Sequence, residues 1–209
     1  MKKPYLISTS AFINDNKRIN DYIISINSYE KYKSEFENVV LVETINKNNV
    51  TYIDESGFKT FYSPLDNTHP NKGFNWTCHI HYYINNNNQI LDDDIIVFIT
   101  GRYKLINTNI IQLINKHLIK DKYEFLAKED GDVYDSGLGV HTFIISFTKK
   151  IFNDFFNWYI DYINHNECIE WSIKKYMKLN PNRCIILPKE TIFGVECNPY
   201  YGGGIKKLC

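Results

Sequence analysis

The sequence lacks the short glycine motifs that hold phosphates in many nucleotide enzymes. No GxGxxG follows the first predicted strand, which argues against the common dinucleotide-binding fold. No GxxxxGK[ST] loop is present, which argues against P-loop kinases and NTPases. The HExxH and GxSxG motifs of zinc proteases and serine hydrolases are also missing. A nucleotide site in this chain therefore has to be built from residues scattered along the sequence.

An excess of positive charge is also absent. The 24 Lys and Arg residues are matched by 24 Asp and Glu residues, whereas a nucleic-acid-binding protein usually carries a basic excess that neutralises phosphates. We therefore expect no nucleic-acid partner. A local basic pocket for one small diphosphate stays compatible with this balance, because net charge does not describe a single site.

Paired cysteines and long apolar runs are missing as well. The five cysteines include no CxxC pair, which makes a zinc site a poor interpretation. Their odd number and the lack of a secretory leader favour reduced thiols and a cytoplasmic location. No apolar run has the length of a membrane span. The expectation is a cytoplasmic protein without a membrane span.

The chain does contain enough apolar material for a folded domain. Hydrophobic residues make up 44% of its 209 residues and aromatic residues 15%, which is globular composition. No linker and no internal repeat interrupts it. The sequence therefore predicts one domain over residues 1–209.

Strands and helices alternate along the sequence. Apolar, β-branched runs predict strands at 5–9, 38–44, 58–62, 94–100 and 123–127, and helical periodicity predicts helices at 17–33, 71–84 and 109–120. Further on we expect a strand at 140–147, helices at 149–163 and 167–179, and a strand at 183–187. This alternation predicts an α/β fold with a mostly parallel central sheet, covered by helices on both faces and wound by right-handed crossovers.

Ligands of an open α/β sheet bind at the carboxyl ends of its strands. Hydroxyls, one carboxylate, a glycine that permits close backbone approach and one arginine stand at the predicted ends: Ser8, Thr9, Glu43, Tyr62, Ser63, Thr100, Gly101, Arg102 and Tyr103. Arginine offers phosphate oxygens a planar, permanently charged fork. Lys72 and Gly73 add an ammonium group at the positive start of a predicted helix. These residues together suit a nucleoside diphosphate.

Each of these residues also has a purely structural interpretation. Ser8 and Thr9 can simply end a strand, and Glu43 can be a solvated residue at a strand end. Arg102 can pair with one of the aspartates at 92–94. Those aspartates precede the strand and should lie at its opposite end, however, which favours a functional arginine.

The order of elements, the helix start at Lys72 and Gly73, the segment 94–103 and the strand that begins at 140 resemble the small GT-A-type nucleotide-sugar glycosyltransferases. The resemblance covers about residues 4–200 and is greatest to compact enzymes of large DNA viruses and of bacterial surface-polysaccharide clusters. In those enzymes a KxTGRY-like stretch ends the central strand, and residues 98–103 here read FITGRY. No single motif in it is as specific as a Walker loop.

The resemblance implies a GT-A-like three-layer α/β/α sandwich that transfers a sugar from a nucleotide-diphosphate sugar. A UDP-sugar is the favoured donor, a glycan or glycoprotein is the acceptor, and the reaction is a hexosyl or deoxyhexosyl transfer with inversion. The protein would be located in the cytoplasm, or in the host cytoplasm for a viral chain. By carry-over, Ser8, Thr9 and Glu43 hold the nucleoside and Lys72 lies near the donor. Residues 1–127 then form the donor-nucleotide half, and residues 128–209 the acceptor and catalytic half.

One departure from the family pattern concerns the metal. Most GT-A enzymes carry a DxD motif after the central strand, whose carboxylates hold a divalent cation against the diphosphate. Residues 100–102 read TGR instead, and an arginine would repel a cation that prefers carboxylate oxygens. We therefore expect transfer without a metal, with Arg102 neutralising the leaving diphosphate. The alternative is Mn²⁺ or Mg²⁺ held by carboxylates such as Glu129, Asp130 or Asp132. The aspartates at 92–94 are expected to cap the loop that they end.

An inverting transferase needs a base that takes the proton of the acceptor hydroxyl. Glu170, with Glu167 as second choice, stands at a late helix start, where GT-A enzymes often place their catalytic acidic residue. Acidic residues are also favoured in any first helical turn by the helix dipole, so the position has a structural explanation too. Contacts with the acceptor are expected from Asp130, Asp132, His141 and Tyr200, although a histidine on a strand is often structural. The aromatic residues 152–162 recur at helical spacing, which favours a core over a sugar platform.

Two other functions remain open. A non-catalytic member of this fold would bind a glycan or serve in assembly, without donor turnover. A nucleotidyltransferase that makes the activated sugar usually carries a glycine-rich, basic first loop, whereas residues 11–15 read AFIND.

Overall fold

Seven strands form the central sheet, in the order β3-β2-β1-β4-β7-β6-β8. The computed structural model describes residues 2–10, 16–44, 56–129, 139–140, 142–162 and 167–197. The strands are β1 (Tyr5–Ser10), β2 (Val39–Glu43), β3 (Lys59–Tyr62), β4 (Ile95–Thr100), β6 (Phe125–Lys128), β7 (Ile144–Thr148) and β8 (Cys184–Leu187). β1 to β4 pair in parallel, and so do β6 and β8, whereas β7 runs antiparallel to both of its neighbours. The predicted α/β fold with a mostly parallel sheet is confirmed.

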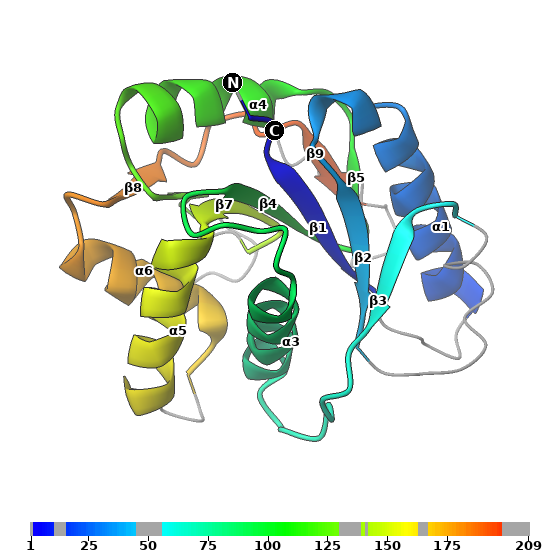
Figure 1. Cartoon of the computed structure of the whole chain (residues 1–209), viewed down its shortest axis with the longest axis horizontal. Helices are drawn as coiled ribbons and strands as arrows, with labels where there is room; N and C mark the ends of the chain where they lie inside the picture. The colour runs from blue at the N-terminus through cyan, green and yellow to red at the C-terminus, as the bar shows by residue number, and fades with distance from the viewer. Residues whose placement is uncertain are drawn as a thin grey trace.

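Helices cover both faces of the sheet (Figure 1). On one face lie α3 (Lys72–Asn86), α5 (Lys149–Tyr162) and α6 (Ile169–Leu179), whose apolar side chains share one core with β1, β4 and β7. On the other lie α1 (Asn16–Glu30), α4 (Asn109–Leu113) and a π-helical continuation, η2 (Ile114–Lys120). A short 3-10 turn, η1 (Lys33–Glu35), follows α1. The three-layer arrangement that the resemblance implied is thus present.

The sequence explains most of these elements. The five residues of β2 are all buried, as their continuous apolar run predicts. Asn71 caps α3, since its side-chain oxygen accepts from the backbone N–H of Phe74 at 3.2 Å. In α5, the side chains at the predicted helical spacing are buried, so their interpretation as core is confirmed: Phe152, Phe155, Phe156 and Tyr159.

Two features differ from the prediction. The predicted strand 140–147 begins only at Ile144, and Val140 forms an isolated bridge with Glu129. A second sheet of two strands was not predicted: β5 (Tyr103–Leu105) pairs antiparallel with β9 (Val195–Cys197). Its two strands are three residues long and ninety residues apart in the sequence, so no local pattern of residues predicts their pairing. The sheet draws its strands from both predicted halves, 1–127 and 128–209, and the division into halves remains a prediction.

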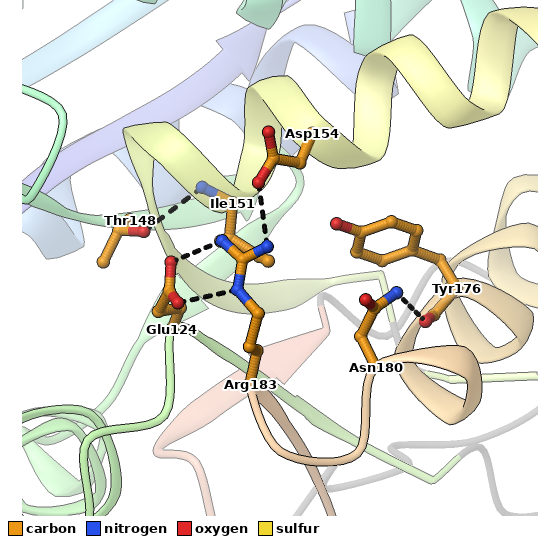
Figure 2. Close-up of polar contacts among 7 residues, drawn as sticks. All are labelled: Glu124, Thr148, Ile151, Asp154, Tyr176, Asn180 and Arg183. Atoms are coloured by element: carbon orange, nitrogen blue, oxygen red, sulfur yellow. Dashed lines mark hydrogen bonds and ion pairs between the residues drawn. The ribbon is translucent and has the colours of Figure 1, made fainter.

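At the edge where β6 and β8 begin, Arg183 joins three elements (Figure 2). Its Nε and Nη2 atoms donate to the two carboxylate oxygens of Glu124 at 2.7 Å each, and Nη1 donates to Asp154 of α5 at 2.9 Å. These bonds to the guanidinium lower the pKa of the Glu124 carboxyl below its ordinary 4.5. The charged form of Glu124 therefore contributes to stability.

We expect Glu124→Gln to lower the free energy of unfolding at pH 7 by about 1–2 kcal/mol, because it removes a charge-assisted bidentate pair. The pKa of Glu124 is lower in the folded chain than in the unfolded chain. The contribution is therefore complete above about pH 4.5 and is lost as the pH falls through the folded-state pKa. Denaturant unfolding at several pH values should show the difference between wild type and variant shrinking in acid. Glu35→Gln, at an exposed position, is the control for the loss of a carboxylate and should leave the free energy of unfolding at pH 7 close to wild type.

Candidate functional site at the carboxyl edge of the sheet

Thr9 and Thr100 lie side by side at the carboxyl ends of β1 and β4. The strand register pairs their Cα atoms directly. Thr9 follows Ile7 by two positions, and Thr100 follows Phe98 by two positions. Ile7 and Phe98 belong to the core under α3, so the side chains of Thr9 and Thr100 point to the same face of the sheet. Trp76 of α3 stacks on Phe98, two residues before Thr100, with ring centroids 4.7 Å apart. The two predicted donor residues are thus brought together beside α3.

Ser8 lies on the opposite face. Its hydroxyl is buried and lies 3.2 Å from the hydroxyl of Tyr29 in α1, which donates in turn to the carbonyl of Tyr103 at 2.9 Å. β1 continues to Ser10, one residue beyond its predicted end. Ser8 is engaged inside the fold, and its contact with a donor stays a prediction.

Glu43 is buried at the end of β2, with 1% of its surface exposed. The alternative that it is a solvated residue at a strand end is therefore wrong. It follows Leu41 by two positions and shares with it the α1 face of the sheet. Its backbone carbonyl accepts from the N–H of Ser63 at 3.1 Å, which fixes the end of β2 to the segment after β3.

Gly101 lets the ends of β1 and β4 approach closely. A Cβ atom at this position would lie 1.9 Å from the carbonyl oxygen of Thr9 and 2.6 Å from the ring of Tyr22. The glycine is thus required by the packing of the fold, and its predicted contact with a ligand remains a prediction. Arg102 follows in the turn and is half-buried. The ring of Tyr103 is buried and stacks on Phe143 at 4.3 Å, so this ring belongs to the core.

The starts of α3 and α6 touch at the same edge. Asn71 donates from its side-chain amide to the carbonyl of Glu167 at 2.8 Å. A Cβ atom on Gly73 would lie 2.6 Å from the Cβ of Ile169, so only glycine fits this contact. Lys72 is exposed, and no acidic residue stands in the first turn of α3. This edge therefore carries an ammonium group at a positive helix start, which suits an anion.

Glu170, the first choice for the base, is linked to the end of β4. The hydroxyl of Thr142 donates to Oε1 of Glu170 at 2.9 Å. The carbonyl of Thr142 accepts from the hydroxyl of Thr100 at 3.2 Å. Thr142 thus joins the predicted base to the predicted donor strand through two hydrogen bonds, although the three residues are far apart in the sequence.

Glu167, the second choice, has a different environment. One of its carboxylate oxygens forms an ion pair with Lys175, which also contacts the hydroxyl of Tyr162. These contacts join the start of α6 to the side chains of Lys175 in α6 and Tyr162 in α5, whereas the Glu170 carboxylate is bound by Thr142. The geometry favours Glu170 over Glu167 as the residue that serves the donor edge.

Several predicted residues lie outside the part of the chain that the structure describes. They are the candidates for the acceptor site: Asp130, Asp132, His141 and Tyr200. Glu129 is described and is exposed, and its carboxylate lies 3.5 Å from the ammonium of Lys174. Asp94 accepts from the N–H of Leu91 at 2.9 Å and from Lys2 at 2.6 Å, which confirms that this aspartate caps the loop before β4.

Thr142 and Cys168 are the residues that sequence reasoning missed. Thr142 follows the isolated bridge and was placed inside a longer predicted strand. Cys168 is the N-cap of α6, and the nearby Glu170 helps to raise the pKa of its thiol after the larger effect of desolvation. Neither residue stands in a motif, so only the folded chain reveals that both lie against the predicted base.

The side chains at the end of β4 do not suit a divalent cation. A hydroxyl, a glycine and an arginine occupy residues 100–102, whereas such cations prefer carboxylate oxygens. Within the described ranges, no three His, Cys, Asp or Glu side chains gather in a way that could hold a metal ion. In the same ranges, no helix is both long and apolar enough to cross a membrane.

Comparison with known proteins identifies the fold through structure alone. No protein-family model matches the sequence, and no curated protein sequence matches it. A solved structure from Desulfovibrio desulfuricans, assigned as a nucleotide-diphospho-sugar transferase, matches with a TM-score of 0.57 and 12% identity, over 90% of this chain and 80% of that one.

Two further solved structures are similar. One, from Bacillus anthracis and assigned as a glucose-1-phosphate thymidylyltransferase in complex with sucrose, has a TM-score of 0.55 and 12% identity over 94% of this chain and 89% of that one. The other is a glycosyltransferase involved in the glycosylation of the major capsid of PBCV-1, with a TM-score of 0.55 and 9% identity over 91% and 83%. The predicted resemblance is confirmed for the fold: the chain has the GT-A-like fold of nucleotide-diphospho-sugar transferases.

Proposed function

We propose that this chain is a glycosyltransferase that moves a sugar from a nucleotide-diphosphate sugar, with a UDP-sugar as the favoured donor, to a glycan or glycoprotein acceptor. The observation that carries the proposal is the link from Glu170 through Thr142 to Thr100 at the end of β4. A base beside the donor edge is what an inverting transfer requires. The fold shared with nucleotide-diphospho-sugar transferases supports the same class.

The donor lies along the carboxyl edge of the sheet in this proposal. Thr9 and Thr100 line its α3 face, and Ser8 and Glu43 support the nucleoside from the other face. Gly101 and Tyr103 shape the turn that carries the arginine. Lys72 and the start of α3 place positive charge at the same edge. The acceptor is bound from the second half by Asp130, Asp132, His141 and Tyr200.

The chemical step follows from these positions. Glu170 takes the proton from the acceptor hydroxyl while the oxygen of that hydroxyl attacks the anomeric carbon of the sugar. The bond from that carbon to the diphosphate oxygen breaks, and the nucleoside diphosphate leaves with the electron pair. The guanidinium of Arg102 neutralises the charge that develops on the diphosphate. We propose that this neutralisation takes the place of a metal ion.

Nucleotide binding provides the first test. We expect at least one of UDP-, GDP- or dTDP-sugars to raise the melting temperature, and Arg102→Ala to abolish that rise, because the diphosphate loses its bidentate partner. Differential scanning fluorimetry measures both. Arg183→Lys is the matched control, since Arg183 lies at the opposite edge and its variant should keep the nucleotide effect. If no nucleotide stabilises the chain, with or without Mn²⁺, the donor site is wrong.

The products separate this proposal from its alternatives. A glycosyltransferase releases a nucleoside diphosphate from the nucleotide sugar. A nucleotidyltransferase releases pyrophosphate from a nucleoside triphosphate and a sugar phosphate. A non-catalytic binding module releases neither. A screen across nucleotide sugars with and without Mn²⁺ or Mg²⁺ therefore tests the class and the metal together.

A further inference from the structure

We propose that Thr142 is a positioning residue that fixes the Glu170 carboxylate against the end of the donor strand. This inference rests on the proposed function, because it assigns Thr142 a role in the reaction for which Glu170 is the base. Thr142 belongs to the short connection between the bridge at Val140 and the start of β7. It binds in two directions at once.

The two bonds of Thr142 use different groups. The backbone carbonyl accepts from the Thr100 hydroxyl, and the side-chain hydroxyl donates to Oε1 of Glu170. Thr142 is 7% exposed, so water competes little for either bond. A change of side chain can therefore remove the bond to Glu170 and leave the bond to Thr100 in place.

The preceding residues hold the same glutamate. The N–H of Val140 donates to the carbonyl of Glu170 at 3.3 Å. A Cβ atom on Gly139 would lie 2.8 Å from the Cβ of Glu170, so glycine is needed for this close approach. Gly139 and Val140 thus contact the Cβ atom and the backbone of Glu170, and the hydroxyl of Thr142 contacts the Glu170 carboxylate.

The phenol and thiol groups near Glu170 stay neutral near neutral pH. Burial raises the pKa of the Tyr159 phenol, and the nearby Cys78, Glu170, Cys168 and Glu167 add smaller contributions in the same direction. The pKa values of both thiols are raised from their ordinary 9.0, mainly by burial. Glu167 is paired with Lys175.

Three threonine variants test the inference. Thr142→Val keeps the shape and the backbone bond to Thr100 and removes only the hydroxyl, whereas Thr142→Ser keeps the hydroxyl. Thr148→Val is the matched control: Thr148 is also buried, it lies at the far end of β7, and its hydroxyl accepts from the N–H of Ile151 at 3.3 Å. That control should lose some stability without any change at Glu170.

We expect Thr142→Val to lower kcat about tenfold with the KM for the donor unchanged, because one bond to a charged group is lost. Thr142→Ser should restore kcat, because it keeps the hydroxyl, and Thr148→Val should match wild type in both kcat and KM. A wild-type kcat in Thr142→Val would overturn the inference.

A second measurement needs no turnover. The side-chain carboxyl resonance of Glu170, observed with ¹³C-labelled glutamate, should move to a different chemical shift in Thr142→Val and stay at its wild-type position in Thr148→Val. If wild type turns over no nucleotide sugar, the proposed function fails. This comparison of spectra then decides the contact by itself: a moved resonance supports the hold of Thr142 on Glu170, and an unmoved one refutes it.

Discussion

We expect Glu170→Gln to lower kcat by about 10²–10⁴-fold and to leave the melting temperature and nucleotide binding close to wild type. A loss of kcat of this size is typical when a general base is removed. An amide has the same shape as the carboxylate, and its oxygen can still accept from the Thr142 hydroxyl that lies 2.9 Å from Oε1. It cannot, however, take the proton of an attacking hydroxyl. Steady-state kinetics with the donor found in the nucleotide screen measure the effect.

Glu167→Gln is the matched control for this loss. It changes the same residue type three positions earlier, but it removes an ion pair with Lys175 and leaves the bond between Thr142 and Glu170 in place. We expect its kcat within about threefold of wild type, because the proposed base is untouched. Unchanged turnover in Glu170→Gln would contradict the base, and a large loss confined to Glu167→Gln would transfer the role to Glu167.

Most of the fold could be predicted because its elements carry strong local patterns. β2 and β4 are continuous apolar runs, and the helices repeat their apolar residues at helical spacing. The direction of β7 could not be predicted, since a buried strand has the same composition in either orientation. β5 and β9 escaped prediction because their pairing joins residues 103–105 with 195–197 and leaves no periodic signal.

The candidate site was predictable in part. Ligands of an open α/β sheet bind at its carboxyl edge. This rule places Thr9, Thr100 and Arg102 in one region from sequence alone. Which of them touch depends on strand order and register, and the sequence does not contain these: the pairing of Thr9 with Thr100 needs β1 and β4 to be neighbours. The contact of Thr142 with Glu170 depends on a connection without a motif, so it could be found only in the structure.

The alternation of side chains along a strand had a consequence for the donor residues. Successive residues of a strand point to opposite faces. Ser8 and Thr9 therefore cannot approach a ligand from the same side, and the structure places Ser8 against Tyr29 of α1 and Thr9 beside Thr100 under α3. A nucleoside that meets both residues has to sit across the end of β1.

The close approach of β1 and β4 at Gly101 yields the prediction with the largest effect on stability. Gly101→Ala should lower the free energy of unfolding by about 2–4 kcal/mol, because its new methyl group would lie 1.9 Å from the carbonyl oxygen of Thr9. That oxygen belongs to the backbone of β1, so it cannot rotate away, and the ring of Tyr22 closes the other side at 2.6 Å. The ends of β1 and β4 must separate instead. Chemical denaturation monitored by circular dichroism measures the loss.

Gly57→Ala separates the clash at Gly101 from the general cost of replacing a glycine. Gly57 has a φ of +73°, and an added Cβ would meet no atom within 4 Å, so its variant should lose only about 1 kcal/mol from the strained backbone conformation. Equal losses in the two variants would mean that β1 and β4 are not in close contact at Gly101. A larger loss at Gly101, accompanied by weaker nucleotide stabilisation, would tie the separation of these two strand ends to the donor edge that Thr9 and Thr100 form.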